Sequence, residues 1–467
     1  MDLSPAASLR SRITVALGRT ARLVSRLRGG GSGGTALPGL VVEKLDPGFL
    51  ARTLGQLPMG VVVVSGTNGK TTTTKMVVQL LREQGLKVLT NRSGSNFVRG
   101  VLASLLTEVD AGGRLSHDVA VLELDEAHAV RFVRLIKPRH ALLLNVMRDQ
   151  LDRFGEIDYT ASLLHKVALA TTGSVVVNAD DPRLGADAFT GDLTARVASF
   201  GAGPALRSLF LSDDDLRTGA ASPQDDADTA DSADSATVES PAASTTPAPR
   251  VSLQSLSGQD AVVRVDGDDH DVAFTIPGIH NQLNACAALA VALETLGDEA
   301  DLAGLLTTLA SVQAAFGRGE VLTLDGRDVQ LSLVKNPAGF RMGLLTAAEA
   351  VRSGGPESVM IAINDEYADG RDMSWLWDVE FAGLRTEGVA VVTGVRAWDM
   401  ALRLRYDEVP IGTVEPDLTR AVALLRRAAS AADDGAGRPM RIFTTYTAML
   451  ALRAHLAELT DVEEALT

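Results

Sequence analysis

The strongest constraint on the fold of this 467-residue chain is the stretch from residue 61 to 81, where an apolar strand leads through a glycine-lysine loop into a helix. Val61 to Val64 has the pattern of a short buried strand, and Thr71 to Leu81 has that of a helix. Backbone N–H groups of such a loop, together with the positive end of the helix dipole, hold phosphates. The stretch therefore predicts a nucleotide site at the carboxyl end of a strand in an α/β sheet.

The chemistry of the loop indicates a nucleotide. Lys70 is expected to neutralise the outer phosphates, and Thr71 is expected to offer its hydroxyl to Mg²⁺. A standard P-loop has glycine at the place that Val64 occupies, so this loop is of another type. A glycine-rich turn with an incidental lysine is the alternative, and the preceding strand argues against it. The predicted ATP-binding residues of the loop are Gly66, Thr67, Asn68, Gly69, Lys70, Thr71 and Thr72.

Strand and helix patterns alternate along the rest of the chain, which is typical of a doubly wound, mostly parallel sheet. The length exceeds what one ordinary core accommodates, so several domains are expected. We predict a basic helix with a glycine-rich joint at 1–45, a central ATP-binding domain at 46–315 and a smaller, Rossmann-like α/β domain at 316–467. Strands near 329–334, 359–363 and 389–392 support the last of these.

One part of the central domain has no globular pattern. Between about 212 and 250 the residues are almost all Asp, Ala, Ser, Thr and Pro. Such a stretch cannot bury enough apolar surface to offset the entropy of ordering it. We predict an acidic, disordered surface insertion.

Composition excludes several classes of protein. A formal net charge of −15 argues against a general role in binding nucleic acid. Cys286 is the only cysteine, which excludes an internal disulfide and a zinc ribbon, so no zinc is expected. Its apolar neighbours indicate a core position. Without a secretory signal or an apolar run long enough to span a bilayer, a cytoplasmic protein is expected.

The N-terminal segment 8–28 allows two interpretations. Leu9, Ile13 and Leu17 recur at helical spacing, and arginines lie between the apolar positions. The helix either packs on its own domain with solvated arginines or lies on the anionic inner face of a membrane.

Carboxylates mark the end of another strand. Glu123 and Asp125 lie two residues apart after an apolar run, so both point to one side of the strand end, where they can reach a cation near the phosphate loop. An acidic strand end without function is the alternative.

Several segments in order resemble the Mur ligase family. They are the loop 64–72, the segment 145–155 with Gln150 where the family has histidine, the segment 178–182 and the sequence His280-Asn281-Gln282-Leu283-Asn284. The resemblance implies Mg²⁺ ligation by Thr71 and Glu123 and adenine recognition by Asn281 and Asn284. Helix capping is the alternative for the two asparagines. Lys166 is only approximately placed for the carbamylated lysine common in the family.

The C-terminal part narrows the resemblance. Segment 316–320 resembles the joint before the Mur C-terminal domain. Segments 335–340 and 369–378 are similar to those of the MurT branch, the synthetase subunits of lipid II isoglutaminyl synthase, and segments 34–39 and 393–397 also fit that pattern. This similarity implies that Arg318 and Lys335 contact ATP phosphates, and that ATP activates the α-carboxylate of D-glutamate in lipid II as an acyl phosphate, which ammonia converts to D-isoglutamine. Arg341 stands where relatives often have asparagine.

The same resemblance implies a separate source of ammonia. It is a GatD-type glutaminase with a cysteine and a histidine, and Asp372 of this chain is implied as the catalytic aspartate that orients that histidine. A loop aspartate that caps a turn is the alternative. Two other functions stay open at this point: an amino-acid ligase such as a folylpolyglutamate synthase, and a nucleotide-binding scaffold at the membrane surface.

Overall fold

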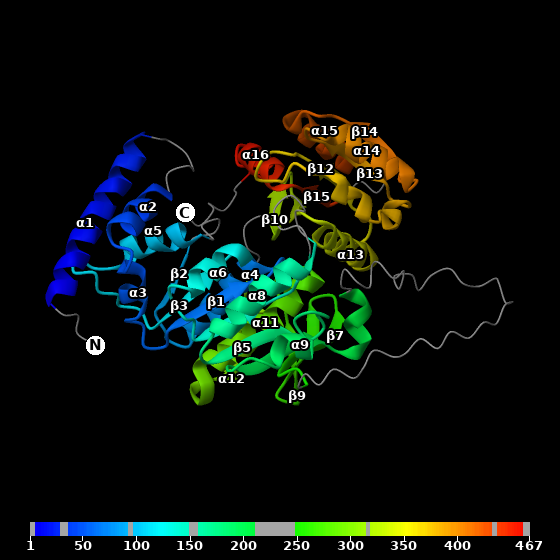
Figure 1. Cartoon of the computed structure of the whole chain (residues 1–467). Helices are drawn as coiled ribbons and strands as arrows, with labels where there is room; N and C mark the ends of the chain where they lie inside the picture. Colours follow the sequence, from blue (N-terminus) through cyan, green and yellow to red (C-terminus); the bar gives the residue numbers. More distant parts are fainter. Residues whose placement is uncertain are drawn as a thin grey trace.

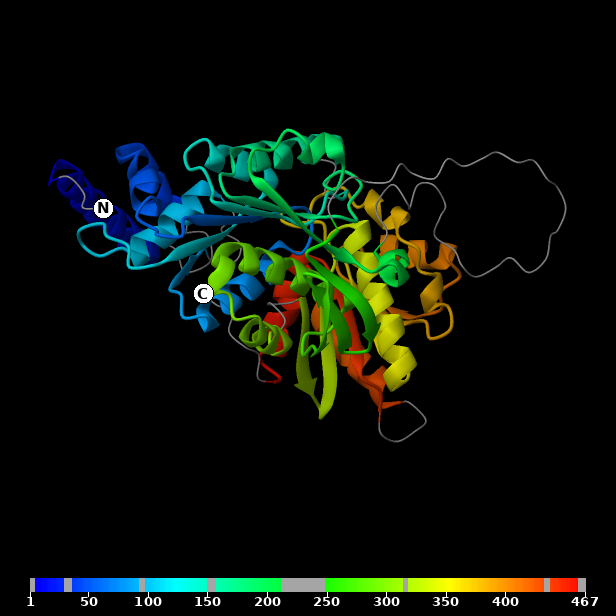
Figure 2. The same cartoon turned by 90° about the horizontal axis from the view of Figure 1, so that it is seen from below.

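The computed structural model describes residues 5–28, 36–91, 97–148, 157–210, 248–313, 318–431 and 437–460. Two α/β units lie side by side, with a group of helices at the far edge of the first unit (Figures 1 and 2). The expected acidic insertion at 212–250 lies outside the described residues except for its last three. Gln150 and the glycine-rich joint at 29–34 also lie outside them.

The central unit is built on a nine-stranded sheet with the order β2-β3-β1-β4-β5-β6-β7-β8-β9. Pairing is parallel from β2 to β7 and antiparallel from β7 to β9. The strands are β1 (Val61–Ser65), β2 (Val88–Thr90), β3 (Val119–Glu123), β4 (His140–Leu143), β5 (Ser174–Asn178), β6 (Arg196–Ala202), β7 (Val251–Ser257), β8 (Asp260–Val265) and β9 (Asp268–Ala273).

Strand β1 explains why both faces of this sheet are covered. Its side chains alternate between faces: Val62 and Val64 enter one hydrophobic core, and Val61 and Val63 enter another. Burial on both faces requires helices on both sides. The helices of this unit are α4 (Lys70–Glu83), α5 (Val98–Glu108), α6 (Glu126–Val133), α8 (Ile157–Ala170), α9 (Asp187–Thr190), η1 (Pro204–Leu209), α11 (Ile279–Leu296), η2 (Gly297–Glu299) and α12 (Leu302–Ala310).

Three helices precede β1: α1 (Pro5–Arg28), α2 (Ala36–Leu45) and α3 (Phe49–Leu54). They lie at the edge of the molecule farthest from the C-terminal unit (Figure 1). Val15 of α1 and Val42 of α2 belong to the same hydrophobic core as Val61 and Val63 of β1. The N-terminal helices are therefore packed onto the central unit.

The C-terminal unit has a sheet with the order β10-β11-β15-β12-β13-β14, parallel except for the β10–β11 pair. The expectation of two α/β units, the first with a doubly wound, mostly parallel sheet, is confirmed. The elements are β10 (Arg318–Leu324), β11 (Arg327–Leu333), α13 (Pro337–Gly354), β12 (Ser358–Ala362), η3 (Ser374–Asp378), η4 (Ala382–Leu384), β13 (Val389–Thr393), α14 (Ala397–Tyr406), β14 (Ile411–Val414), α15 (Leu418–Ser430), β15 (Met440–Thr444) and α16 (Tyr446–Leu456).

Candidate functional site

The phosphate loop lies between β1 and α4, and two of its glycines have backbone angles that favour glycine. Gly66 has φ +131° and Gly69 has φ +84°. A Cβ atom on Gly69 would lie 2.7 Å from Oδ1 of Asn284, and one on Gly66 would lie 3.0 Å from the backbone nitrogen of Asn145. The loop can therefore pass close to its neighbours only because these positions lack side chains.

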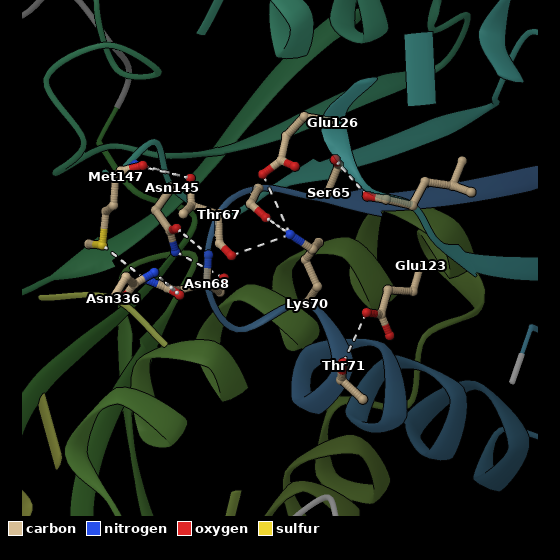
Figure 3. Close-up of polar contacts among 12 residues, drawn as sticks. Ser65, Thr67, Asn68, Lys70, Thr71, Glu123, Glu126, Asn145, Met147 and Asn336 are labelled. Carbon is tan, nitrogen blue, oxygen red and sulfur yellow. Dashed lines mark hydrogen bonds and ion pairs between the residues drawn. The ribbon is translucent and has the colours of Figure 1, made fainter. Parts of the chain in front are cut away.

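Asn145 and Met147, which follow β4, hold the phosphate loop through hydrogen bonds (Figure 3). The Asn68 N–H donates to Oδ1 of Asn145 over 2.8 Å, and Nδ2 of Asn145 donates to the Asn68 carbonyl over 3.2 Å. The Thr67 hydroxyl donates to the Met147 carbonyl and accepts from the Met147 N–H. Sequence reasoning placed Asn145 and Met147 in a family segment but assigned them no role, because nothing local shows which loop they face.

The ammonium group of Lys70 is held inside the loop. Its Nζ lies 2.5 Å from the Gly66 carbonyl, 3.3 Å from the Thr67 carbonyl and 3.5 Å from Oε1 of Glu126 (Figure 3). Only 8% of Lys70 is exposed. Burial raises the pKa of Glu126, and the charge of Lys70 opposes that rise. A phosphate at this loop would meet a cation that is already positioned.

Thr71 and Glu123 form the oxygen pair expected for a cation. The Thr71 hydroxyl donates to Oε1 of Glu123 over 2.9 Å (Figure 3). The backbone of Glu123 is held on both sides by buried Asn91, whose Nδ2 donates to the Glu123 carbonyl and whose Oδ1 accepts from the Glu123 N–H. A hydroxyl and a carboxylate are ligands that suit Mg²⁺, so this pair fits a magnesium ion. Asn91 carried no signal in the sequence.

A cavity extends from the phosphate loop between the two units. Asn281 and Asn284 are buried and line it, and the recognition of adenine by them stays a prediction. Nδ2 of Asn281 donates to the Pro277 carbonyl just before its own helix. This is not the capping bond named as the alternative, because the N-cap residue of α11 is Gly278 and no side chain there accepts from a backbone N–H. Asn284 instead lies against Gly69. Arg341 of α13 is also in the lining, so the C-terminal unit contributes to the same cavity.

The segment 178–182 supports the cavity wall through a buried carboxylate. Asp181 accepts hydrogen bonds from the backbone N–H groups of Val146, Arg183 and Leu184. Burial raises its pKa despite these bonds. Asp181 thus ties the loop after β4, which braces Asn68, to the loop after β5.

The C-terminal unit contacts the phosphate loop directly. Nζ of Lys335 lies 3.3 Å from the Thr67 carbonyl. The amides of Asn336 and Asn68 donate to each other, with Nδ2 of Asn336 lying 3.0 Å from Oδ1 of Asn68. A salt bridge also joins the two units next to the loop: Nη1 of Arg148, which follows β4, lies 2.6 Å from Oδ2 of Asp378 in η3. Arg318 begins β10, but its side chain lies outside the described residues, so its contact with ATP stays a prediction.

Asp372 is exposed at the surface, unlike the buried residues of the phosphate loop. Its side chain is exposed, and Oδ1 accepts from the Ser374 N–H over 2.9 Å. This hydrogen bond lowers the pKa of Asp372. Nearby Asp369 is only 2% exposed and accepts from the backbone and the hydroxyl of Thr447. Asp369 anchors the segment, whereas Asp372 presents its carboxylate to the surface from a turn.

The single cysteine has the expected core position. Cys286 is fully buried in α11, and burial raises the pKa of its thiol to about 12. A thiol in that state is not a nucleophile, so this residue does not form a glutaminase site.

Two family models match most of the chain: the Mur ligase middle domain over residues 64–292 and the MurT ligase C-terminal domain over residues 333–449. The lipid II isoglutaminyl synthase (glutamine-hydrolyzing) subunit MurT of Streptococcus pneumoniae is 29% identical over 96% of this chain and 98% of its own length. The subunit of the same name from Staphylococcus aureus strain COL is 27% identical over 89% of this chain and 92% of its own. The MurF ligase of Thermotoga maritima, solved in complex with ADP, has a TM-score of 0.61 at 16% identity, covering 92% of this chain and 88% of that one.

The fold and the phosphate loop define an ATP-dependent ligase of the Mur type. Within that class, the two relatives named above align over nearly the whole of this chain, and both are MurT subunits. The C-terminal family model is that of the same branch. The chain belongs to the MurT family.

Proposed function

We propose that this chain is the synthetase subunit of a lipid II isoglutaminyl synthase, which amidates the α-carboxylate of D-glutamate in the lipid II stem peptide. The observation that carries the proposal is the end-to-end alignment with MurT subunits that are named for this activity. The buried phosphate loop and its direct contacts with the C-terminal unit support it, because an ATP-driven ligation needs both parts.

The reaction has two steps. A carboxylate oxygen attacks the terminal phosphorus of ATP and ADP leaves, which turns a poor electrophile into a good one. Ammonia then adds to the acyl carbon, inorganic phosphate leaves with the bonding electrons, and the nitrogen loses a proton to give the amide. Lys70 and Lys335, which both lie at the Thr67 carbonyl, counter the negative charge on the transferring group, and Arg318 is proposed to assist them.

Mg²⁺ is the proposed metal. Thr71 and Glu123 would hold it, since their oxygen atoms lie next to each other beside the loop. The ion supplies charge neutralisation of the phosphates when bound. Binding of adenine by Asn284, which adjoins Gly69, and by Asn281 belongs to the same proposal. No zinc is expected, and that stays a prediction.

Ammonia is proposed to come from a GatD-type glutaminase. Asp372 supports this part, because an exposed carboxylate on an anchored segment can reach the histidine of another chain. Cys286 is unsuited to the glutaminase reaction, which also points to a second subunit.

We place the reaction on the cytoplasmic side, where ATP is available. None of the described helices combines the length and the apolar character that crossing a bilayer requires. The lipid-linked substrate therefore has to be met at the surface of the membrane.

The direct test is amidation of purified lipid II by the full chain and a co-expressed glutaminase, with ATP, Mg²⁺ and glutamine. We expect conversion of D-glutamate to D-isoglutamine, detected as a loss of 1 Da by mass spectrometry, with one ADP formed per amide. Ammonium should replace glutamine. If lipid II remained unchanged while the chain joined free glutamate to an acceptor carboxylate, the chain would be an amino-acid ligase such as a folylpolyglutamate synthase. ATP turnover that needed no acceptor would indicate the scaffold alternative.

A further inference from the structure

The outer face of α1 carries a row of large, exposed apolar side chains that belong to none of the hydrophobic cores of the described residues. Leu9 is 61% exposed, Ile13 54%, Leu17 46% and Leu23 60%, and these four residues are called the outer stripe below. The first three are spaced by four residues, so they lie above one another on one side of the helix. A helix on the surface of a domain normally shows water its polar face.

The opposite face of α1 is fully used within the chain. Val15 is buried in the central core, and Gly18 lies so close to Leu106 of α5 and Val42 of α2 that a Cβ atom there would be under 3.0 Å from both. The hydroxyl of buried Thr14 lies 3.1 Å from Oδ2 of Asp46. The helix is therefore held in one orientation, and that orientation turns the outer stripe away from the central unit.

Arginines flank the outer stripe. At 100° per residue, Arg12 and Arg19 lie along one side of it and Arg10 along the other. Arg10 is 59% exposed while it pairs with Asp46, and Arg19 donates to the carbonyls of Leu106 and Val109 at the end of α5. The sequence of α1 contains six arginines and no acidic residue, in a chain whose formal net charge is −15.

This arrangement matches the surface of an anionic bilayer. Apolar side chains enter the region between headgroups and acyl chains, while arginines at the flanks reach the phosphates. The acidic remainder of the chain is repelled by the same surface, so the basic helix sets the orientation. We infer that the outer stripe of α1 and its flanking arginines dock the protein on an anionic lipid surface.

The inference goes beyond the proposed amidation and does not depend on it. It combines the two interpretations of residues 8–28, because the helix packs on its own domain through one face and offers the other to lipid. Since α1 lies at the edge of the central unit away from the C-terminal unit, docking there leaves the second unit clear of the bilayer (Figures 1 and 2).

The test is co-sedimentation of the full chain with vesicles, without ATP or lipid II. We expect binding to vesicles of phosphatidylcholine mixed with phosphatidylglycerol, and weaker binding to phosphatidylcholine alone or at high salt. The triple variant Leu9→Ser, Ile13→Ser, Leu17→Ser should lose affinity by about tenfold or more, and Arg12→Gln by about fivefold. All four side chains are exposed, so folding should be retained, with circular dichroism as the check.

The matched control removes three exposed leucines elsewhere: Leu135→Ser, Leu169→Ser and Leu459→Ser, which are 48%, 46% and 40% exposed. It should bind vesicles like the wild type. Equal binding by the stripe variant, or no binding of the wild type to anionic vesicles, would overturn the inference. A concentration-dependent dimer that only the stripe variant loses, without vesicle binding, would assign the stripe to a second copy of the chain. Failure of amidation with intact vesicle binding would count against the proposed function alone.

Discussion

The phosphate loop and the segment 369–378 differ in where their partners lie. Each polar group described at the loop meets another part of the same chain: Asn68 meets Asn145 and Asn336, and Lys70 meets Glu126. In the segment, Asp369 is anchored internally, but the carboxylate of Asp372 faces solvent with a hydrogen bond only to the neighbouring turn among the contacts described. A site that holds phosphates is thus organised in advance by its own fold, whereas a carboxylate at the surface is suited to a partner chain.

Lys70→Met should produce the largest effect. Replacing the ammonium group removes the cation that is buried beside the phosphate loop, so amidation should fall by about a thousandfold or more with glutamine and with ammonium alike. Rates with both nitrogen sources measure it. Lys87→Met is the control, because the Lys87 side chain is exposed and the hydrogen bond from Lys87 to Oδ2 of Asp118 is donated by its backbone N–H. Activity within severalfold of the wild type would mean that the loop does not hold the reacting phosphates.

Asp372→Asn tests the other region. Because an amide cannot stabilise a protonated histidine as a carboxylate does, glutamine-driven amidation should fall by about a hundredfold or more, while ammonium-driven amidation stays near the wild-type rate. The ratio of the two rates is the readout. Asp378→Asn is a comparison in the same segment, since it weakens the contact with Arg148 and should affect both rates equally. If Asp372→Asn reduced both rates equally, Asp372 would have no role specific to glutamine.

Gly69→Ala should raise the KM for ATP by about tenfold or more, because a methyl group there meets Asn284 inside the site. The variant should also lose about 1 kcal/mol of stability from its positive φ. Gly85→Ala is the matched control: its φ of +85° is nearly the same as the +84° of Gly69, but no atom lies within 4 Å of the added Cβ. It should lose similar stability in thermal unfolding without a change in KM. Equal KM values for the two variants would show that Gly69 has no special closeness to the nucleotide.

Asn336→Ser should have the smallest effect. Oδ1 of Asn336 caps α13 by accepting from the Gly339 N–H, and its amide also pairs with Asn68. Serine can retain the cap but cannot reach the loop, so kcat should fall by about tenfold while the free energy of unfolding changes by less than about 0.5 kcal/mol. Asn336→Ala should add a loss of about 1 kcal/mol from the cap. An unchanged kcat in Asn336→Ser would show that the amide pair does not help the two units work together.

Much of the architecture could be predicted from the sequence. The four valines before Gly66 indicated a strand that is buried on both faces, and Gly66, Gly69 and Lys70 indicated the phosphate loop. The strands expected at 329–334, 359–363 and 389–392 are β11, β12 and β13. Strand β4 ends at Leu143, because the residues after it leave the sheet to brace the loop.

Other features were missed or gave no local signal. The antiparallel strands β8 and β9 were not anticipated, although the Asp266-Gly267 pair between them is a typical two-residue hairpin turn with positive φ at both residues. Asn91 carried no pattern that distinguishes a clamp on Glu123 from a loop asparagine. The outward orientation of Leu9, Ile13 and Leu17 could not be read from their spacing, because the spacing is equal whether that face meets a core or solvent.

By itself, the sequence determined the type of fold, the place of the phosphate loop and the membership of a family, because these follow from short-range patterns of apolar residues, glycines and charges. Only the tertiary structure decided which side chains meet. Asn145 and Asn336 lie 77 and 268 residues from Asn68, and they contact it because parallel strands end at one sheet edge and a second unit packs against that edge. Such contacts depend on how whole elements are placed, and no local pattern records that placement.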